Sequence, residues 1–284
     1  MSFSQLRPLS IGEVLDGAFT IYRRQFSSLF LTALVPQLPM IALFTAYYGF
    51  MGTIAGATTA GSEPSTTVFM GFGLAMLVLV PIALIGSAVA VGAVTFQTAR
   101  AYTGAPVATR EALTRGLQRA LPLAAAYFVV GVLSFFGLLA FIVGFFVVWI
   151  SAFAVAPAVV LERRGPIDAL GRSWALVKGA WGEVFLVVFI AYLIALIPGY
   201  AVGMFATIGG LLLVGGDMQK AMAVQAVGQV LSQLARTLTI PFSVGAVVLL
   251  YYDRRVRSEA LDVQMMAESL AATPPPEQPA PAWG

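Results

Sequence analysis

The sequence contains no cysteine and no histidine. Without cysteine the chain has no disulfide, no thiolate nucleophile and no cysteine-based metal site. Without histidine it lacks the commonest general base and the commonest metal ligand, which excludes histidine-based zinc sites, serine–histidine triads and histidine phosphoryl relays. Chemistry that uses carboxylates alone is not excluded by these two absences. We therefore expect no metal, no cofactor and no catalytic residue.

Charge is also scarce, because only 10% of the 284 residues are charged and 59% are hydrophobic. A soluble domain carries about 25% charged residues. The mean hydropathy is +0.89, and the apolar residues form stretches of about 20 or more, long enough to cross a hydrocarbon core of roughly 30 Å. The composition predicts an all-α integral membrane protein. The pI of about 9.3 comes with a net charge of only +3, which favours anionic lipid over nucleic acid as the partner.

The apolar stretches predict six transmembrane helices. The apolar stretch 120–161 is 42 residues long, and one helix of that length would measure about 63 Å, twice the membrane. We therefore expect two spans there, with a tight turn near Gly137 to Gly144. A loop without lysine or arginine is expected at 51–67. The six spans cover about 28–50, 68–97, the two halves of 120–161, 184–205 and a last stretch that ends at Tyr252.

The basic residues predict the orientation. All 16 lysines and arginines except Lys220 and Arg236 lie before the first span, after the sixth, or in the second-to-third and fourth-to-fifth connections. By the positive-inside rule these segments face the cytoplasm. We expect a multi-pass protein of the bacterial cytoplasmic (inner) membrane with both termini in the cytoplasm. Its first 26 residues are amphipathic and do not resemble a cleavable signal.

Amphipathic helices are expected before spans 1, 3 and 5. Ser10 and Glu13 form a capping box, and apolar residues follow at helical spacing up to Phe26. The segment that begins at Pro166 aligns with this one at a shift of 155 residues, and the segment around Glu111 is a weaker copy. Such helices either lie in the headgroup region or pack on the bundle as linkers.

The predicted membrane domain covers 1–257 and consists of three repeats of a helix and a hairpin. The repeats fall at about 8–67, 106–161 and 165–220, with span 6 extending to 252, a further amphipathic helix at 258–271 and a disordered proline-rich tail at 272–284. Their basic residues should contact anionic headgroups on the cytoplasmic side. The expected lipid contacts are Arg23, Arg24, Arg115, Arg119, Arg172 and Lys178.

One polar line stands out near the sixth span, and its members share one helix face: Gln225, Gln229, Gln233 and Arg236. An ionisable residue inside a membrane is a functional hypothesis by default, and this face could line a pathway for an anionic or amphipathic substrate. Alternatively, Arg236 lies 16 residues before Tyr252, about 24 Å along a helix, where it could anchor the helix at the outer interface. The carboxylates near the central connection are expected to cap helices and form salt bridges; they are Glu162, Asp168 and Glu183.

Three stretches resemble a known family. They are Arg7 to Asp16, Pro157 to Trp174 around Gly165-Pro166-Ile167-Asp168, and Tyr251 to Arg257. They are similar to the bacterial glycerophosphoryl diester phosphodiesterase membrane domain and its uncharacterised six-span relatives. In some members that region precedes a separate catalytic domain whose acid/base residues include histidines. This chain has no histidine, so the resemblance implies a membrane fold and transfers no catalytic residue.

These observations favour a non-enzymatic membrane protein, an accessory or scaffold in lipid or envelope organisation. Its partners would be membrane lipids and a protein partner or a second copy of the chain. The alternative is a transporter or lipid-handling channel that uses the line from Gln225 to Arg236. A membrane enzyme would need carboxylates that converge in one cavity, of which the sequence gives no sign.

Overall fold

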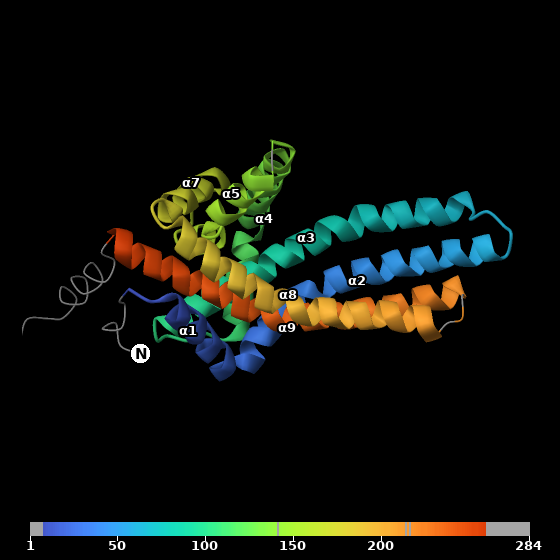
Figure 1. Ribbon diagram of the computed structural model, residues 1–284, viewed down its shortest axis with the longest axis horizontal. Coiled ribbons are helices and arrows are strands. Elements are labelled where there is room, and N and C mark those ends of the chain that lie inside the picture. Colours follow the sequence, from blue (N-terminus) through green and yellow to red (C-terminus); the bar gives the residue numbers. More distant parts are fainter. Residues whose placement is uncertain (1–7, 141, 214, 216, 260–284) are drawn as a thin grey trace, which may run out of the picture.

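The computed structural model describes residues 8–140, 142–213, 215 and 217–259, and within these residues every regular element is a helix (Figure 1). The expected tail at 272–284 and nearly all of the expected helix at 258–271 lie outside the described residues. The helices are α1 (Ile11–Arg24), α2 (Phe26–Thr59), α3 (Thr66–Tyr102), α4 (Thr109–Ala140), α5 (Ile142–Ser151), α6 (Val155–Val160), α7 (Pro166–Val177), α8 (Trp181–Leu213) and α9 (Met218–Glu259).

Six segments are long and apolar enough to cross a membrane, namely α2, α3, α4, α5 with α6, α8 and α9. This confirms the predicted all-α multi-pass membrane fold. The long helices exceed the predicted spans, because α2 has 34 residues and α9 has 42, or roughly 51 and 63 Å. In Figure 1 they extend together with α3 and α8 well past the α4–α5 hairpin. The expected loop at 51–67 is helical as far as Thr59, since residues 51–63 contain no proline that would interrupt the helix.

The second hairpin turns where the glycines predict. Gly137 and Gly144 face each other so closely that a Cβ on Gly137 would lie 2.8 Å from the Gly144 backbone. The fourth span differs from the expected single helix, since it breaks between α5 and α6. Pro157 explains the break, because a proline ring clashes with the carbonyl four residues earlier. The fully buried Ser173 of α7 accepts the Ala154 N–H at 2.9 Å and donates to the Ser151 carbonyl at 2.5 Å.

Helices α1 and α7 are the two outer amphipathic helices of the prediction. The capping box of α1 is present in both directions, with Ser10 N–H to Glu13 at 2.8 Å and Glu13 N–H to Ser10 at 3.3 Å. Val14 and Ala18 are buried on the bundle side, whereas Phe19 is 51% exposed, so α1 both packs on the bundle and presents an aromatic side chain outward. The middle copy is not a separate helix, because α4 continues without a break from Thr109 into the third span.

Helix α9 is the central element of the bundle, since it contacts α1, α2, α3, α7 and α8. At its charged end Leu249, Leu250 and Tyr251 are almost completely inaccessible. Helix α1 approaches it closely, because Ala18 lies within 3.6 Å of where a Cβ would stand on Gly245. The end of α9 is therefore held among the elements that form the site.

Gly86 gives a test of the α2–α3 packing. A Cβ on Gly86 would lie 2.2 Å from the Pro36 carbonyl oxygen of α2, and backbone cannot rotate away as a side chain can. We expect Gly86→Ala to lower the free energy of unfolding by about 1–3 kcal/mol, measured by thermal unfolding in detergent. Gly73→Ala on the same helix, with nothing within 4 Å, should be neutral or stabilise by up to about 1 kcal/mol. Equal melting temperatures for the two variants would contradict this packing.

Candidate functional site

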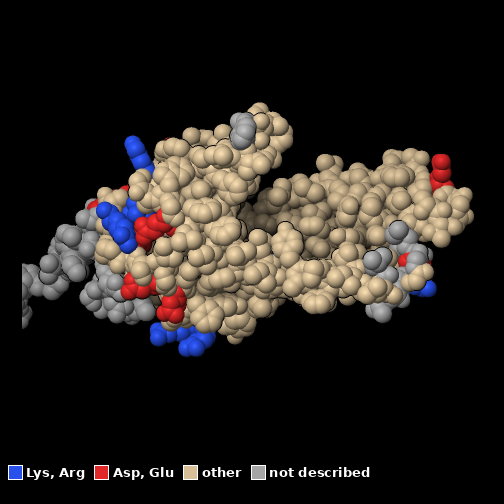
Figure 2. Space-filling model, viewed as in Figure 1, with Lys and Arg blue, Asp and Glu red and all other residues tan. Residues whose placement is uncertain are grey.

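The charged side chains gather at one end of the molecule. Figure 2 shows blue and red atoms concentrated there, an uncharged surface along the extended helices, and few charges at the far end. The sequence explains the pattern, because Glu63 and the Asp217–Lys220 ion pair lie in or beside the far connections, while the other connections carry the arginines. Any site for a charged ligand is therefore to be sought at the densely charged end.

Asp253 is the most deeply buried charge at this end, with a side chain that is 0% exposed. Its Oδ1 accepts the Leu9 N–H at 2.7 Å and the Arg257 Nε–H at 3.0 Å. Arg257 also donates to the Leu9 carbonyl at 2.7 Å. The end of α9 thus binds the chain just before α1, across 244 residues of sequence.

Glu162, directly after α6, is the centre of a second group of ion pairs. It accepts hydrogen bonds from Tyr251 at 2.5 Å and Arg172 at 2.9 Å, and from Arg164 at 2.5 Å. Arg172 also pairs with Glu259. Burial is the largest single influence on Glu162 and opposes its ionisation, but these hydrogen bonds together lower its pKa below the usual value. The Glu162 carboxylate therefore links the segment after α6 to α7 and α9.

Glu183 of α8 adds a third group of ion pairs. Together, the contacts of Asp253, Glu162 and Glu183 are called the ion-pair network. It lies 3.6 Å from Arg254 and 3.5 Å from Arg257, and Arg254 also donates to the Leu176 carbonyl at 3.1 Å. The expected salt bridges of Glu162 and Glu183 are confirmed. The three stretches that resemble the membrane-domain family all contribute to this network, which gives them a shared structural role.

Arg172 differs from the expectation that it contacts lipid. Its guanidinium is occupied by Glu162 and Glu259, carboxylates that the fold brings from two other elements. Arg23, Arg24 and Lys178 are exposed, and their contact with lipid headgroups stays a prediction. Arg115 and Arg119 lie together in the pocket that follows.

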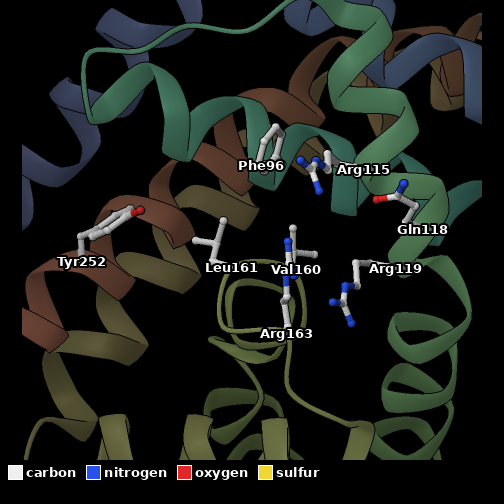
Figure 3. Close-up of a pocket in the computed structure, with 8 residues that line it drawn as sticks. All are labelled: Phe96, Arg115, Gln118, Arg119, Val160, Leu161, Arg163 and Tyr252. Carbon is white, nitrogen blue, oxygen red and sulfur yellow. The ribbon is translucent and has the colours of Figure 1, made fainter.

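A pocket of about 660 Å³ opens beside the ion-pair network, and three arginines line it (Figure 3). Arg115 and Arg119 lie one turn apart on α4, and Arg163 comes from the connection between α6 and α7; in Figure 3 their side chains extend toward the same space. The other lining residues are Phe96, Gln118, Val160, Leu161 and Tyr252, so none of the lining residues is acidic. We call this site the arginine pocket.

Arg163 occupies an unusual backbone conformation, with φ of 56°, and among the described residues no other non-glycine residue has a positive φ. Such a conformation costs on the order of 1–3 kcal/mol. The turn is held by the Arg164 N–H, which donates to the Ala158 carbonyl at 3.1 Å. It directs the neighbouring arginines apart, with Arg164 bound to Glu162 and Arg163 lining the pocket. Sequence reasoning counted Arg163 only as a topology signal.

The arginine pocket has the chemistry of an anion site. Guanidinium groups remain charged at any physiological pH and match phosphate oxygens with paired donors. Arg115, Arg119 and Arg163 form no ion pair with any residue that the structure describes. Arg115 lies 5.8 Å from the centre of the Phe96 ring, a cation–π contact that orients it. The three charges are therefore available to a ligand.

The polar line on α9 packs against α8. Gln225 donates to Thr207 at 3.0 Å, and the Arg236 guanidinium lies 4.6 Å from the Tyr200 ring centre, with its side chain close to Gly199. Gln229 and Gln233 are half-buried on the same helix. None of the pockets described in this article is lined by any of these four residues. The structure brings the line together on one helix and packs two of its members, Gln225 and Arg236, against α8.

The six apolar spans, the single charged end and the arginine pocket define a multi-pass α-helical membrane protein. Comparison of the chain with models of known families, with curated proteins and with solved structures finds no significant match in any of the three.

The lowered pKa of Glu162 predicts that the free energy of unfolding depends on pH. Its pKa is lowered in the folded protein, so its stabilising contribution is present above its ordinary value of 4.5 and is lost as pH falls below that value through the folded pKa. We expect Glu162→Gln to lose roughly 1–3 kcal/mol at pH 7 and to show a shallower acid loss than the wild type. Thermal unfolding in detergent from pH 7 to pH 3 measures both. Glu63→Gln, at an exposed position, is the control, and an equal effect from both variants would contradict the role of Glu162.

Proposed function

We propose that this protein is a non-enzymatic membrane protein that binds the phosphate headgroup of an anionic lipid in the arginine pocket. It would act as an accessory or scaffold in lipid or envelope organisation. The observation that carries the proposal is the convergence of Arg115, Arg119 and Arg163, without acidic neighbours in the lining, on one open pocket of about 660 Å³. The pocket lies at the end of the bundle where charged residues meet the apolar spans, which is where lipid headgroups lie.

The number of arginines favours a headgroup with more than one negative charge. A phosphodiester carries a single charge, whereas a phosphate monoester carries about −1.5 to −2 at pH 7 and offers three acceptor oxygens. Three guanidinium groups can then each pair with a different oxygen. The apolar side chains of Phe96, Val160 and Leu161 in the same lining suit the adjoining glycerol and acyl region. Phosphatidate is the simplest lipid with this chemistry.

The orientation and the family are part of the proposal. The positive-inside rule places the arginine pocket and both termini on the cytoplasmic side of the bacterial inner membrane. We also propose that the chain is related to the glycerophosphoryl diester phosphodiesterase membrane domain family. The three stretches that carry the resemblance meet in the ion-pair network, through Leu9, Glu162 and Asp253. This supports membership of the family, because it gives the three motifs a common structural reason to occur together. The transporter alternative is weaker, because the line from Gln225 to Arg236 packs on α8.

Native mass spectrometry of the detergent-solubilised protein tests the headgroup preference. Phosphatidate, phosphatidylglycerol and phosphatidylcholine with identical acyl chains would be titrated at constant salt. We expect phosphatidate to bind about tenfold more tightly than phosphatidylglycerol, since one additional charge-assisted contact is worth about 1.5 kcal/mol. Phosphatidylcholine should bind most weakly. Equal retention of all three lipids would contradict a phosphate site.

A further inference from the structure

A second cavity, separate in its lining from the arginine pocket, lies within the bundle. It has a volume of about 250 Å³ and is enclosed by residues of α3, α4, α5, α6, α8 and α9 and of the α5–α6 connection. No charged residue lines it; most of the lining is valine and alanine. The lining residues that carry a polar group are Thr95, Tyr127, Tyr192, Ser243 and Trp149. We call it the inner cavity.

The inner cavity contains one buried hydroxyl that has no partner among the described residues, that of Thr95. Ser243 is occupied, because its hydroxyl donates to the Ile240 carbonyl at 3.1 Å. Thr95 is fully buried, and its hydroxyl has no partner among the described residues; the same holds for buried Thr98. By contrast, buried Thr32 and Thr237 each donate to a carbonyl one turn back. A polar group left unpaired in this way destabilises the fold. The cavity wall therefore favours a ligand that accepts or shares hydrogen bonds.

An apolar cavity adjoins the inner cavity, because Val130 and Ala152 line both. It has a volume of about 280 Å³ and lies between α4, α5 and α7, where its other lining residues are Leu133, Val148, Ser151, Leu170, Gly171 and Trp174. The break between α5 and α6 shapes this region, since Ala152 belongs to the interruption. One cavity thus offers hydroxyl groups in an uncharged setting, and its neighbour offers hydrocarbon surface.

We propose that the two adjoining cavities form a binding site for one neutral, single-chain lipid with a hydroxyl or ester headgroup, such as a monoacylglycerol. The headgroup would lie in the inner cavity near Tyr127 and Tyr192, and the chain would pass Val130 and Ala152 into the apolar cavity. A charged headgroup is disfavoured, because no ionised residue lines either cavity and an unpaired charge is costly to bury. This site is distinct from the arginine pocket in both lining and ligand charge.

The tryptophans allow a direct test, because Trp149 lines the inner cavity. A variant with Trp181 and Trp283 replaced by phenylalanine keeps only Trp149 and Trp174, one in the lining of each cavity. The probe is 9,10-dibromostearoyl monoacylglycerol, whose bromines quench tryptophan fluorescence, titrated into the detergent-solubilised protein. We expect saturable quenching that unbrominated monooleoylglycerol reverses. Quenching that rises linearly with probe and is not reversed would overturn the proposal.

Two kinds of variant separate the roles of the cavities. Ala152→Phe fills the shared wall and should abolish saturable quenching; Val130→Phe tests the same wall if the first variant does not fold. Tyr127→Phe combined with Tyr192→Phe keeps the ring shapes and removes the hydroxyls. It should weaken monoacylglycerol binding about tenfold, as expected for loss of about 1.4 kcal/mol of hydrogen bonding. The affinity for a dibromoalkane, which forms no hydrogen bond, should not change. Unchanged monoacylglycerol affinity in the tyrosine variant, or unchanged quenching in both wall variants, would overturn the assignment.

Discussion

Replacing Arg115, Arg119 and Arg163 together with glutamine is expected to lower the affinity for phosphatidate at least about 100-fold. Each guanidinium that pairs with a phosphate oxygen contributes about 1.5–3 kcal/mol, and each 1.4 kcal/mol is a factor of ten. We expect a single replacement to cost roughly tenfold, with Arg163 no weaker than the two arginines of α4 because its strained turn directs it to the pocket. Native mass spectrometry with phosphatidate measures the change.

A matched variant separates the pocket from general surface charge. Arg23, Arg24 and Lys178 are exposed and do not line the arginine pocket. Replacing these three with glutamine removes the same net charge, yet we expect less than about a threefold loss, because exposed and solvent-screened charges contribute little to one bound lipid. If both triple variants lost affinity equally, binding would be a property of the surface, and the pocket assignment would be wrong.

Asp253→Asn is expected to lower the free energy of unfolding by about 1.5–3 kcal/mol, the usual worth of a hydrogen bond to a charged group. The Asp253 side chain is completely inaccessible, and it holds both the Leu9 N–H and Arg257. Asparagine preserves the shape but removes the buried charge beside Arg257, which keeps, among the described residues, only the longer 3.5 Å pair with Glu183. Thermal unfolding in detergent, followed by tryptophan fluorescence, gives the measurement.

The control for Asp253 is the same chemical change at an exposed ion pair. Asp217 lies 3.0 Å from Lys220, and their side chains are 40% and 75% exposed. Asp217→Asn should change stability by no more than about 1 kcal/mol, the usual worth of a surface pair. A similar loss for both aspartates would show that the ion-pair network at the charged end does not hold the fold together.

The sequence predicts features of this fold that depend on neighbouring residues. The capping box of Ser10 and Glu13, the turn between Gly137 and Gly144 and the six apolar spans all follow from short-range spacing or from composition. The lengths of α2 and α9 were underestimated, because a membrane-thickness rule stops a span at about 20 residues while uncharged, helix-compatible sequence continues.

The site depended on contacts between distant residues and was only partly predictable. Arg115 and Arg119 share a helix face by their spacing, so their proximity could be expected. Arg163 joins them through a turn with positive φ that follows α6, and Arg172 is diverted to Glu162 and Glu259. No local pattern encodes either outcome. A signal for Arg163 did exist, since Arg163-Arg164 stands between a carboxylate and Gly165-Pro166 directly after an apolar helix.

Site-directed cysteine labelling tests the central claim, that the bundle crosses the membrane with the arginine pocket on the cytoplasmic side. The chain has no native cysteine, so Lys178→Cys at the charged end and Glu63→Cys at the far end each introduce a single thiol at an exposed position. In intact bacterial cells whose outer barrier is permeabilised, a membrane-impermeant maleimide should label Glu63→Cys and not Lys178→Cys, and inverted membrane vesicles should give the reverse. Labelling of both positions from the same side, or of Lys178→Cys from outside the cell, would contradict the account.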